Sequence, residues 1–472
     1  MGTRVSTWDY EFDWTLEHMT AEQMKPLMFS YDELATKCLD RFDELVPSLP
    51  LRTTRKTPQP DASSKPQEAS PENACPHPDF YELLKTHAPN DPTLQRLWDE
   101  VNTIPDWVDW AEIERGQKVF LRYAGPFIVS LTFQALLGGM GSWRIVETLT
   151  RTGGFGVKVA RRRLLETFQH ILDVTESLPS IQPGGRGFAS TLRVRLLHAS
   201  IRRRILRLAS KDPSYFPTST LGTPISNLDS LGTILTFSAD PTWVSLPRQG
   251  IHLRPSEITS YLALWRYIAH LIGAPTAPLS HPSLAKATME SLILSEIAPT
   301  PTSALLANNI IAALQNQPPA YASSSFLRAE AHWLNGPALA SALSIPKPPL
   351  FYTLLVAGQC LFFMTTCYVR RAIPSWDEAF IIKIRRRIRE LTLEQVGGEE
   401  AKHAFQYVPE LGVITQGEEV TERERSRWFA SWGSGSVERR NLLAVVVAAG
   451  VAWLCASNAV AFVGRAVGSA LF

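Results

Sequence analysis

The sequence contains few cysteines, and they are not arranged as a zinc site or a disulfide framework requires. Neither a C-x-x-C pair nor a Cys/His cluster occurs among the five: Cys38, Cys75, Cys360, Cys367 and Cys455. Structural zinc sites are built from such clusters, so none is expected. A sparse, odd set also argues against a secreted, disulfide-rich protein and favours a reducing compartment for the main body.

The sequence also lacks an excess of charge of one sign. Its formal net charge is only +2, which gives no electrostatic reason to expect nucleic acid. Two basic runs, "IRRRIL" and "KIRRRIREL", contain no interleaved aromatic residues on which bases could stack. No nucleic-acid partner is therefore expected.

The N-terminus lacks the apolar stretch of a secretory signal, because Asp9, Glu11 and Asp13 interrupt it. Gly2 and Ser6 do match the M-G-x-x-x-[ST] pattern of N-myristoylation. The alternative is an ordinary frayed terminus.

Hydrophobic residues are abundant, at 45% with thirteen Trp, and indicate a core along most of the 472 residues. Between about Leu94 and Gly398 they recur at helical spacing, and period-two runs are scarce. The prediction is an all-α domain over residues 79–430. A proline-rich, disordered linker at 57–78 would separate it from an N-terminal leader at 1–56.

The C-terminal region predicts a membrane anchor. Residues 441–464 contain no Asp, Glu, Lys or Arg, and 24 helical residues at about 1.5 Å each can cross a bilayer core of about 30 Å. A Gly/Ser/Arg hinge at 431–440 precedes them, and its arginines place the body in the cytosol by the positive-inside rule. The alternative is a buried, Ala-rich core helix.

Two further segments leave alternatives open. Residues 349–369 are uncharged and could form a second membrane span, but scattered polar residues favour a buried central helix. Residues 381–391, "IIKIRRRIREL", form a basic amphipathic helix. Such a helix either has a solvated face or lies against anionic headgroups.

His198 stands in an apolar helical stripe surrounded by arginines, "STLRVRLLHASIRRRIL". Arg195, His198 and Arg202 fall near one helix face at i, i+3 and i+7. This arrangement suits a haem, with imidazole on the iron and guanidinium groups on the propionates. A hydrogen-bonded core histidine is the alternative, and spacing alone favours it.

One helix earlier, Arg163 and Thr167 are an i, i+4 pair, with Glu166 beside them. A guanidinium and a hydroxyl that project together can hydrogen-bond dioxygen or carbonyl products. A solvated arginine cluster is the simpler interpretation of the same spacing.

Six stretches occur in an order that resembles a known family. They are "IPDWVDWAEIERGQKVFLRY", "TRTGGF", "RRRLLET", "RVRLLHASIRRRI", "GTPISNLDSLGTILTFS" and "YLALWRYIAHLIGAP". Over roughly Leu94 to Leu350 the chain is similar to the family that unites bacterial latex-clearing rubber oxygenases with the endoplasmic-reticulum-bound oxygenase of mycophenolic acid biosynthesis. Several blocks in the right order are far more specific than any one of them.

The resemblance implies a globin-like, all-helical domain that holds a b-type haem and uses dioxygen to cleave carbon–carbon double bonds of isoprenoid chains. It implies that His198 is the proximal iron ligand, that Arg163 and Thr167 are the distal pair, and that Glu147 lies near the place of a distal carboxylate base. An endoplasmic-reticulum membrane follows from the fungal relative alone.

The chain departs from the family's pattern at two positions. Glu166 replaces a lysine that can cap the iron, so a lysine-closed resting state is not expected. His270 stands where the family commonly has glycine, and we expect a core histidine there.

Two functions remain open from the sequence. One is a membrane-anchored, haem-dependent oxygenase that acts on a hydrophobic, isoprenoid-like substrate with dioxygen, with Glu147 or Glu166 assisting proton removal. The other is a non-catalytic helical protein of the same fold that binds a lipid or a partner at the membrane. Sequence alone predicts neither the substrate nor the oligomeric state.

Overall fold

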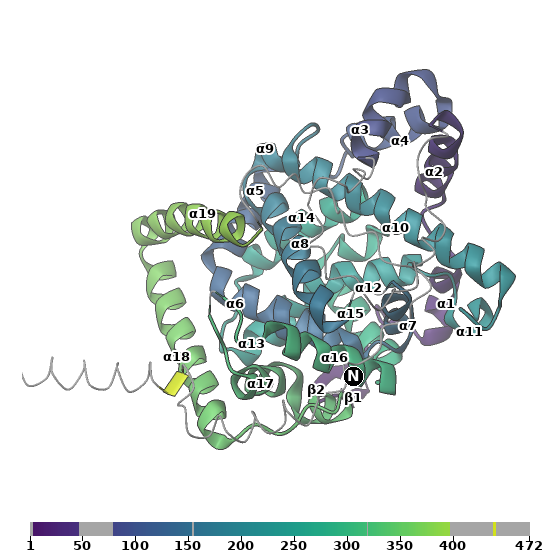
Figure 1. Ribbon diagram of the computed structural model, residues 1–472. Helices are drawn as coiled ribbons and strands as arrows, with labels where there is room; N and C mark the ends of the chain where they lie inside the picture. The colour runs from purple at the N-terminus through teal and green to yellow at the C-terminus, as the bar shows by residue number, and fades with distance from the viewer. Residues whose placement is uncertain (1–2, 47–78, 153–154, 319, 397–437, 440–472) are drawn as a thin grey trace, which may run out of the picture.

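One two-stranded hairpin is the only sheet in the part of the chain that the computed structural model describes, residues 3–46, 79–152, 155–318, 320–396 and 438–439. Its strands are antiparallel, with Val5 opposite Phe12. Helices make up the rest of the fold, as Figure 1 shows, which confirms the predicted all-α class.

The N-terminal elements, up to the first cavity helix, are β1 (Arg4–Thr7), β2 (Tyr10–Asp13), α1 (Ala21–Phe29), α2 (Glu33–Leu45), α3 (Phe80–His87), η2 (Ala88–Asn90), α4 (Pro92–Asn102), α5 (Trp110–Arg122), α6 (Ala124–Val129), η3 (Ser130–Leu137), η4 (Gly138–Gly141) and α7 (Trp143–Arg151). The central elements are α8 (Val157–Thr175), α9 (Leu178–Ile181), α10 (Arg186–Lys211), α11 (Thr218–Leu221), α12 (Asn227–Phe237), η5 (Pro241–Ser245), α13 (Leu246–Arg248) and α14 (Pro255–Ile272). The C-terminal elements are η6 (Ala277–Leu279), α15 (Pro282–Glu296), α16 (Pro301–Leu314), α17 (Ser324–Ala342), α18 (Leu350–Ala372) and α19 (Pro374–Val396).

Local sequence signals explain where many helices begin. Asp91 accepts hydrogen bonds from the first-turn amides of α4, and Pro92 follows it. Ser226 and Asp229 form a reciprocal capping box at α12. These caps satisfy backbone N–H groups that the first helical turn leaves without partners.

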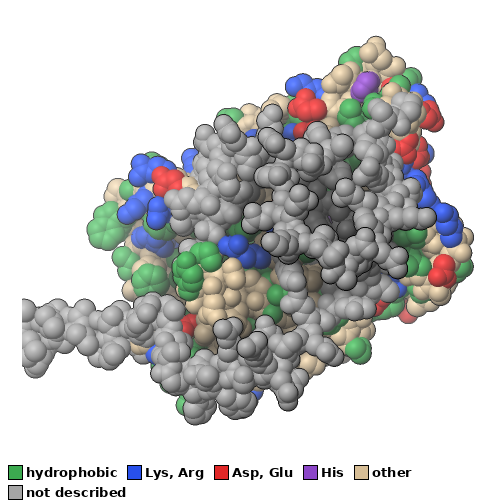
Figure 2. All heavy atoms as spheres, in the orientation of Figure 1, with side chains coloured by type: hydrophobic (Ala, Val, Ile, Leu, Met, Phe, Trp, Pro, Cys, Tyr) green, Lys and Arg blue, Asp and Glu red, His purple; other side chains and the backbone are tan. Residues whose placement is uncertain are grey.

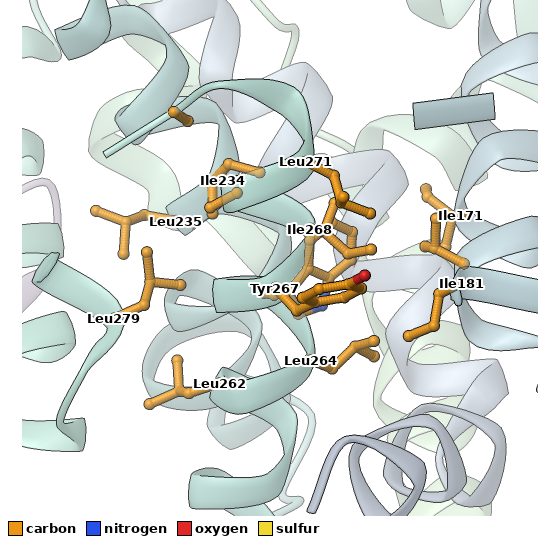
Figure 3. Packing of buried hydrophobic residues seen from close by; sticks show 14 of the residues in the cluster. Ile171, Ile181, Ile234, Leu235, Leu262, Leu264, Tyr267, Ile268, Leu271 and Leu279 are labelled. Carbon is orange, nitrogen blue, oxygen red and sulfur yellow. The ribbon is translucent and has the colours of Figure 1, made fainter. Parts of the chain in front are cut away.

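Helix α14 lies at the centre of the core. Its side chains Leu264, Tyr267 and Ile268 are fully buried, and Figure 3 shows them packed between Ile171 of α8 and Ile234 of α12. Close helix packing requires a glycine at one crossing. A Cβ at Gly116 of α5 would overlap the Ser260 carbonyl oxygen of α14.

The N-terminal segment is part of this core, which corrects the division at 1–56. Residues 3–46 were expected to form a leader separate from the main domain. Instead Met24, Leu39 and Phe42 are buried within the central cluster, and His18 Nε2 lies 3.0 Å from Glu290 Oε2 of α15. The sequence could not show this, because the partners are distant in the chain.

Helix α18 also differs from the expectation. Residues 349–369 were expected to form a buried central helix. Instead α18 runs along an edge of the molecule in Figure 1, and only 22% of its most apolar stretch is buried. A second stretch apolar enough to cross a membrane, Ala124–Gly141, is 61% buried. The expected linker at 57–78, the anchor at 441–464, Gly2 and the hinge at 431–440 lie outside the described residues, apart from 438–439.

Candidate functional site

A large apolar cavity lies among five helices, α7, α8, α10, α12 and α14. About 1400 Å³ of space between atoms lies among these helices, a volume that includes space open to bulk solvent. Its walls are mostly aliphatic and aromatic, with a few polar groups: Ile145, Thr148, Leu149, Thr152, Arg163, Glu166, Thr167, His170, Val194, Leu197, His198, Ile201, Ile225, Asp229, Ser230, Thr233, Ile234, Phe237, Trp265, Ile268 and Ile272.

Helical periodicity determines which side chains reach this cavity. On α8 the lining residues are Arg163, Glu166, Thr167 and His170, which are spaced i, i+3, i+4 and i+7 and share one face. The same spacing recurs on α7 from Ile145 and on α10 from Val194. Each helix therefore presents one stripe to a common space.

His198 lies on the α10 stripe and borders the cavity. Within the described part of the chain its imidazole has no hydrogen-bond partner, unlike a satisfied core histidine. Burial and the nearby charges of Arg202 and Arg163 lower the pKa of His198 to about 3. The ring is thus neutral at physiological pH, with a nitrogen lone pair available to a metal.

On α8 the structure brings together the predicted Arg163, Thr167 and Glu166. The guanidinium of Arg163 lies 5.7 Å from the centre of the Phe155 ring. Burial raises the pKa of Glu166, against the opposing charges of Arg162 and Arg163. Arg162 Nε donates to Glu166 Oε1 at 3.3 Å. The cavity face of α8 therefore presents one cation, one hydroxyl and one carboxylate of increased basicity to the apolar walls.

His170 is a cavity residue that the sequence analysis missed. Its Nδ1 lies 3.0 Å from Ser190 Oγ of α10, and the residue borders the cavity. Burial lowers its pKa to about 4. The signal was present, because His170 continues the face of Arg163 and Thr167 by one turn.

Asp229 also borders the cavity and was missed. Arg144 Nη2 donates to its Oδ1 at 2.8 Å, and its Oδ2 caps the Ser226 amide. Burial raises the pKa of Asp229 despite the charge of Arg144. These bonds tie α7 to α12, which indicates a structural role for this carboxylate at the cavity wall.

The structure does not bring Glu147 to the cavity. Its carboxylate pairs with Arg151 one turn along α7. At about 100° per residue, Glu147 falls about 200° around the helix from Ile145, on the face away from the cavity. The suggested distal base is therefore not at the site, because helical register turns it away.

Arg195 and Arg202 also point elsewhere. Both are buried, about 90° around α10 from the cavity stripe. Arg195 Nε donates to Asp32 Oδ2 at 2.7 Å, while Arg202 Nη2 donates to the Ile225 carbonyl oxygen at 2.8 Å. The expected propionate contacts are thus replaced by contacts to the N-terminal segment and a loop. His270, outside the cavity, meets the Trp107 ring edge to face, with 6.3 Å between the ring centres, and packs as a core histidine.

The residues present fit a haem. The cavity supplies one unpaired, neutral imidazole, long apolar walls and one cation, Arg163, for an anionic propionate. No group of three or more His, Cys, Asp or Glu that could hold a bare metal ion occurs among the described residues. A single protein donor suffices for haem iron, because the macrocycle supplies four nitrogens.

Residues 121–357 match the family model "ER-bound oxygenase mpaB/B'/Rubber oxygenase, catalytic domain". The chain belongs to this oxygenase family. The matched region contains all the cavity-lining residues, and it agrees with the resemblance seen in the sequence.

A solved structure supports the family's fold. The structure of latex clearing protein LCP in the closed state is similar, with a TM-score of 0.55 and 17% identity over 76% of this chain and 91% of that chain. At this identity the likeness concerns the fold alone. No curated protein matches the chain.

Proposed function

We propose that this protein is a haem-dependent oxygenase that acts with dioxygen on an isoprenoid or other unsaturated, lipid-like substrate. The observation that carries the proposal is His198, a neutral imidazole without a hydrogen-bond partner, at the wall of a large apolar cavity in an oxygenase fold. The proposed reaction is oxidative cleavage of a carbon–carbon double bond, in which both oxygen atoms enter two carbonyl products.

His198 would hold the iron of a haem b, and Arg163 would pair with one propionate or with the polar end of the bound molecules. Bound haem supplies an iron centre that binds and activates dioxygen. Thr167, one turn from Arg163 on the same face, donates its hydroxyl proton as a hydrogen bond to oxygen atoms held beside it. Glu166 would accept an allylic proton from the substrate at a carboxylate oxygen and return it as the two carbonyl products form, because the cleavage has no net proton change, and its raised pKa strengthens it as a base.

The cavity walls favour a hydrophobic substrate. Leu197, Ile201, Phe237 and Ile268 present only hydrocarbon to the enclosed space, and burial of apolar surface contributes about 25 cal/mol per Å². An extended polyprenyl chain satisfies this surface, whereas a sugar or nucleotide leaves polar groups without partners.

Such a substrate partitions into bilayers, which agrees with membrane attachment through residues 441–464, the body facing the cytosol. The endoplasmic reticulum is the proposed membrane, by analogy with the family description. Two apolar helices that are long enough to cross a membrane support membrane association only in general terms.

The test of this function is dioxygen consumption by the haem-loaded, detergent-purified protein with polyprenyl and unsaturated-lipid substrates, with carbonyl products identified by mass spectrometry. We expect Glu166→Gln to lower kcat about 10²-fold or more and to leave the haem spectrum unchanged. Glu147→Gln, on the opposite face of its helix, is the matched control and should retain full activity. Haem uptake without dioxygen consumption on any substrate would instead indicate the non-catalytic lipid-binding protein.

A further inference from the structure

Helix α18 carries an apolar face that the described fold leaves uncovered. Its residues are between 46% and 72% exposed and lie on one side of the helix: Leu350, Leu354, Leu361, Phe362 and Val369. We refer to these residues as the outer face of α18. Contiguous apolar surface of this kind marks a binding or membrane surface.

The opposite face of α18 belongs to the protein core. Val356 and Cys367 are buried, Tyr368 Oη donates to the Gly250 carbonyl oxygen at 3.0 Å, and Gln359 contacts Glu330 of α17. Protein therefore covers one side of the helix along its length. Lipid could surround only the other side, so α18 cannot be an isolated spanning helix.

The outer face of α18 contains no charged side chain. Residues 349–369 contain no ionisable Asp, Glu, Lys or Arg, and the two arginines that follow turn inward. Arg371 Nη1 donates to Tyr123 Oη at 3.0 Å, and the Arg370 guanidinium lies 3.5 Å from the centre of the Phe380 ring. The outer face thus carries no charged group, and its one exposed hydroxyl, that of Thr365, donates to the Leu361 carbonyl oxygen of the same helix.

The next helix supplies the groups that membrane interfaces favour. Trp376 is exposed where α19 begins, and Lys383, Arg386 and Arg387 are exposed further along it. Figure 2 shows basic and hydrophobic side chains together over this region. Tryptophan gathers at the headgroup level, and basic residues attract anionic lipids.

We propose that the outer face of α18 lies in the plane of a lipid bilayer, immersed about 5–10 Å, with the basic side of α19 on anionic headgroups. This inference rests on the proposed function for its membrane setting. A bilayer can cover an uncharged face along a whole helix, because lipid needs no shape complementarity. The neighbouring helix α19, which carries Trp376 and basic residues, then lies at the boundary between the lipid and water.

The experiment uses the full-length protein in vesicles of phosphatidylcholine and phosphatidylglycerol. Cys75 and Cys455 are replaced by serine, and a nitroxide is attached to a cysteine introduced at Leu354, Leu361 or Val369. Electron paramagnetic resonance then measures collisions with dioxygen and with a water-soluble nickel chelate. Ser214, exposed on another part of the surface, is the aqueous control, and the buried Val356 is the packed control.

We expect oxygen-to-nickel accessibility ratios that are several-fold higher at all three outer positions than at Ser214, with similar depths, and low collision with both reagents at Val356. Nickel accessibility like that of Ser214 would overturn the proposal. Low collision with both reagents together with spin–spin broadening would also overturn it, because these indicate a second copy of the chain. A depth maximum at Leu361 alone would overturn it too, because it indicates a helix that spans the bilayer. A Soret spectrum of the same samples reports haem binding separately, so failure of the oxygenase proposal is distinguishable.

Discussion

At the residue scale, the account depends on two histidines that the fold keeps neutral. His198 has no hydrogen-bond partner in the described structure, while Ser190 holds His170. Burial is the main reason that both pKa values fall. Neutral imidazoles are what a cavity for an iron cofactor and an apolar substrate requires.

Neutral His170 makes the fold sensitive to acid. Its pKa is about 4 in the folded protein, against about 6.5 in an unfolded chain. Below about pH 6.5, His170 therefore binds a proton in the unfolded chain but not in the folded protein. The stability that the neutral ring confers is present above that pH and is lost as the pH falls toward 4.

We expect His170→Asn to reduce this sensitivity, because the amide can retain the bond to Ser190 and does not titrate. The difference in unfolding free energy between wild type and His170→Asn should shrink by up to about 1.4 kcal/mol per pH unit between 6.5 and 4. Denaturant titrations at several pH values measure it. His252→Ala, at an exposed histidine, is the surface control for the substitution itself. Parallel curves for His170→Asn and wild type would contradict the assignment.

At the element scale, α10 serves two purposes with two faces. One stripe, with His198, borders the cavity, and an adjacent one, with Arg195 and Arg202, binds the N-terminal segment. Arg195 pairs with Asp32, at the start of α2, and with Glu100 of α4. The arginines thus position the helix that carries the histidine.

Removal of the Asp32 charge should therefore weaken the fold and leave the haem spectrum unchanged. We expect Asp32→Asn to cost about 3 kcal/mol, because a buried guanidinium loses a partner. Asp40→Asn, at the more exposed pair with Arg203 of the same helix, should cost less than about 1 kcal/mol. Denaturation midpoints and haem spectra of both variants provide the comparison. A shifted haem spectrum in Asp32→Asn would indicate that Arg195 contacts the cofactor.

Sequence patterns predicted those parts of the site that depend on helical register. Arg163, Glu166, Thr167 and His198 reach one cavity, because periodicity and the order of the blocks locate them. The patterns failed where contact with a segment distant in the chain determines which way a side chain points. A helical wheel groups Arg195 with His198 but cannot show that α2 covers that side.

The same limit explains the errors outside the site. An uncharged run such as 349–369 is compatible with burial in protein and with burial in lipid. Its environment could therefore not be predicted from the sequence. The N-terminal segment is short and mostly polar in sequence. Its few apolar side chains nevertheless pack in the core against helices more than 100 residues away in the chain.

At the scale of the whole molecule, the cofactor site and the predicted membrane anchor are separate in the sequence. The cavity-lining residues lie between Ile145 and Ile272, and the anchor is predicted at 441–464. Haem binding should thus not depend on the C-terminal segment.

A chain that ends at residue 440 should retain the wild-type ratio of haem to protein absorbance, although it should leave membranes more readily in carbonate extraction. Absorbance spectra and flotation on a density gradient measure the two properties. The chain truncated at residue 464, which keeps the anchor, is the control. Loss of haem from the shorter chain alone would show that the C-terminal segment contributes to the site.

The central claim, that His198 holds haem iron, has a direct test in the ultraviolet–visible spectrum of detergent-purified protein expressed with haem supplied. Wild type is compared with His198→Ala and with His252→Ala, at an exposed histidine outside the cavity. We predict a Soret band in wild type and His252→Ala that is lost or strongly shifted in His198→Ala. An unchanged band in His198→Ala, or a folded wild-type protein with no Soret band, would contradict the account.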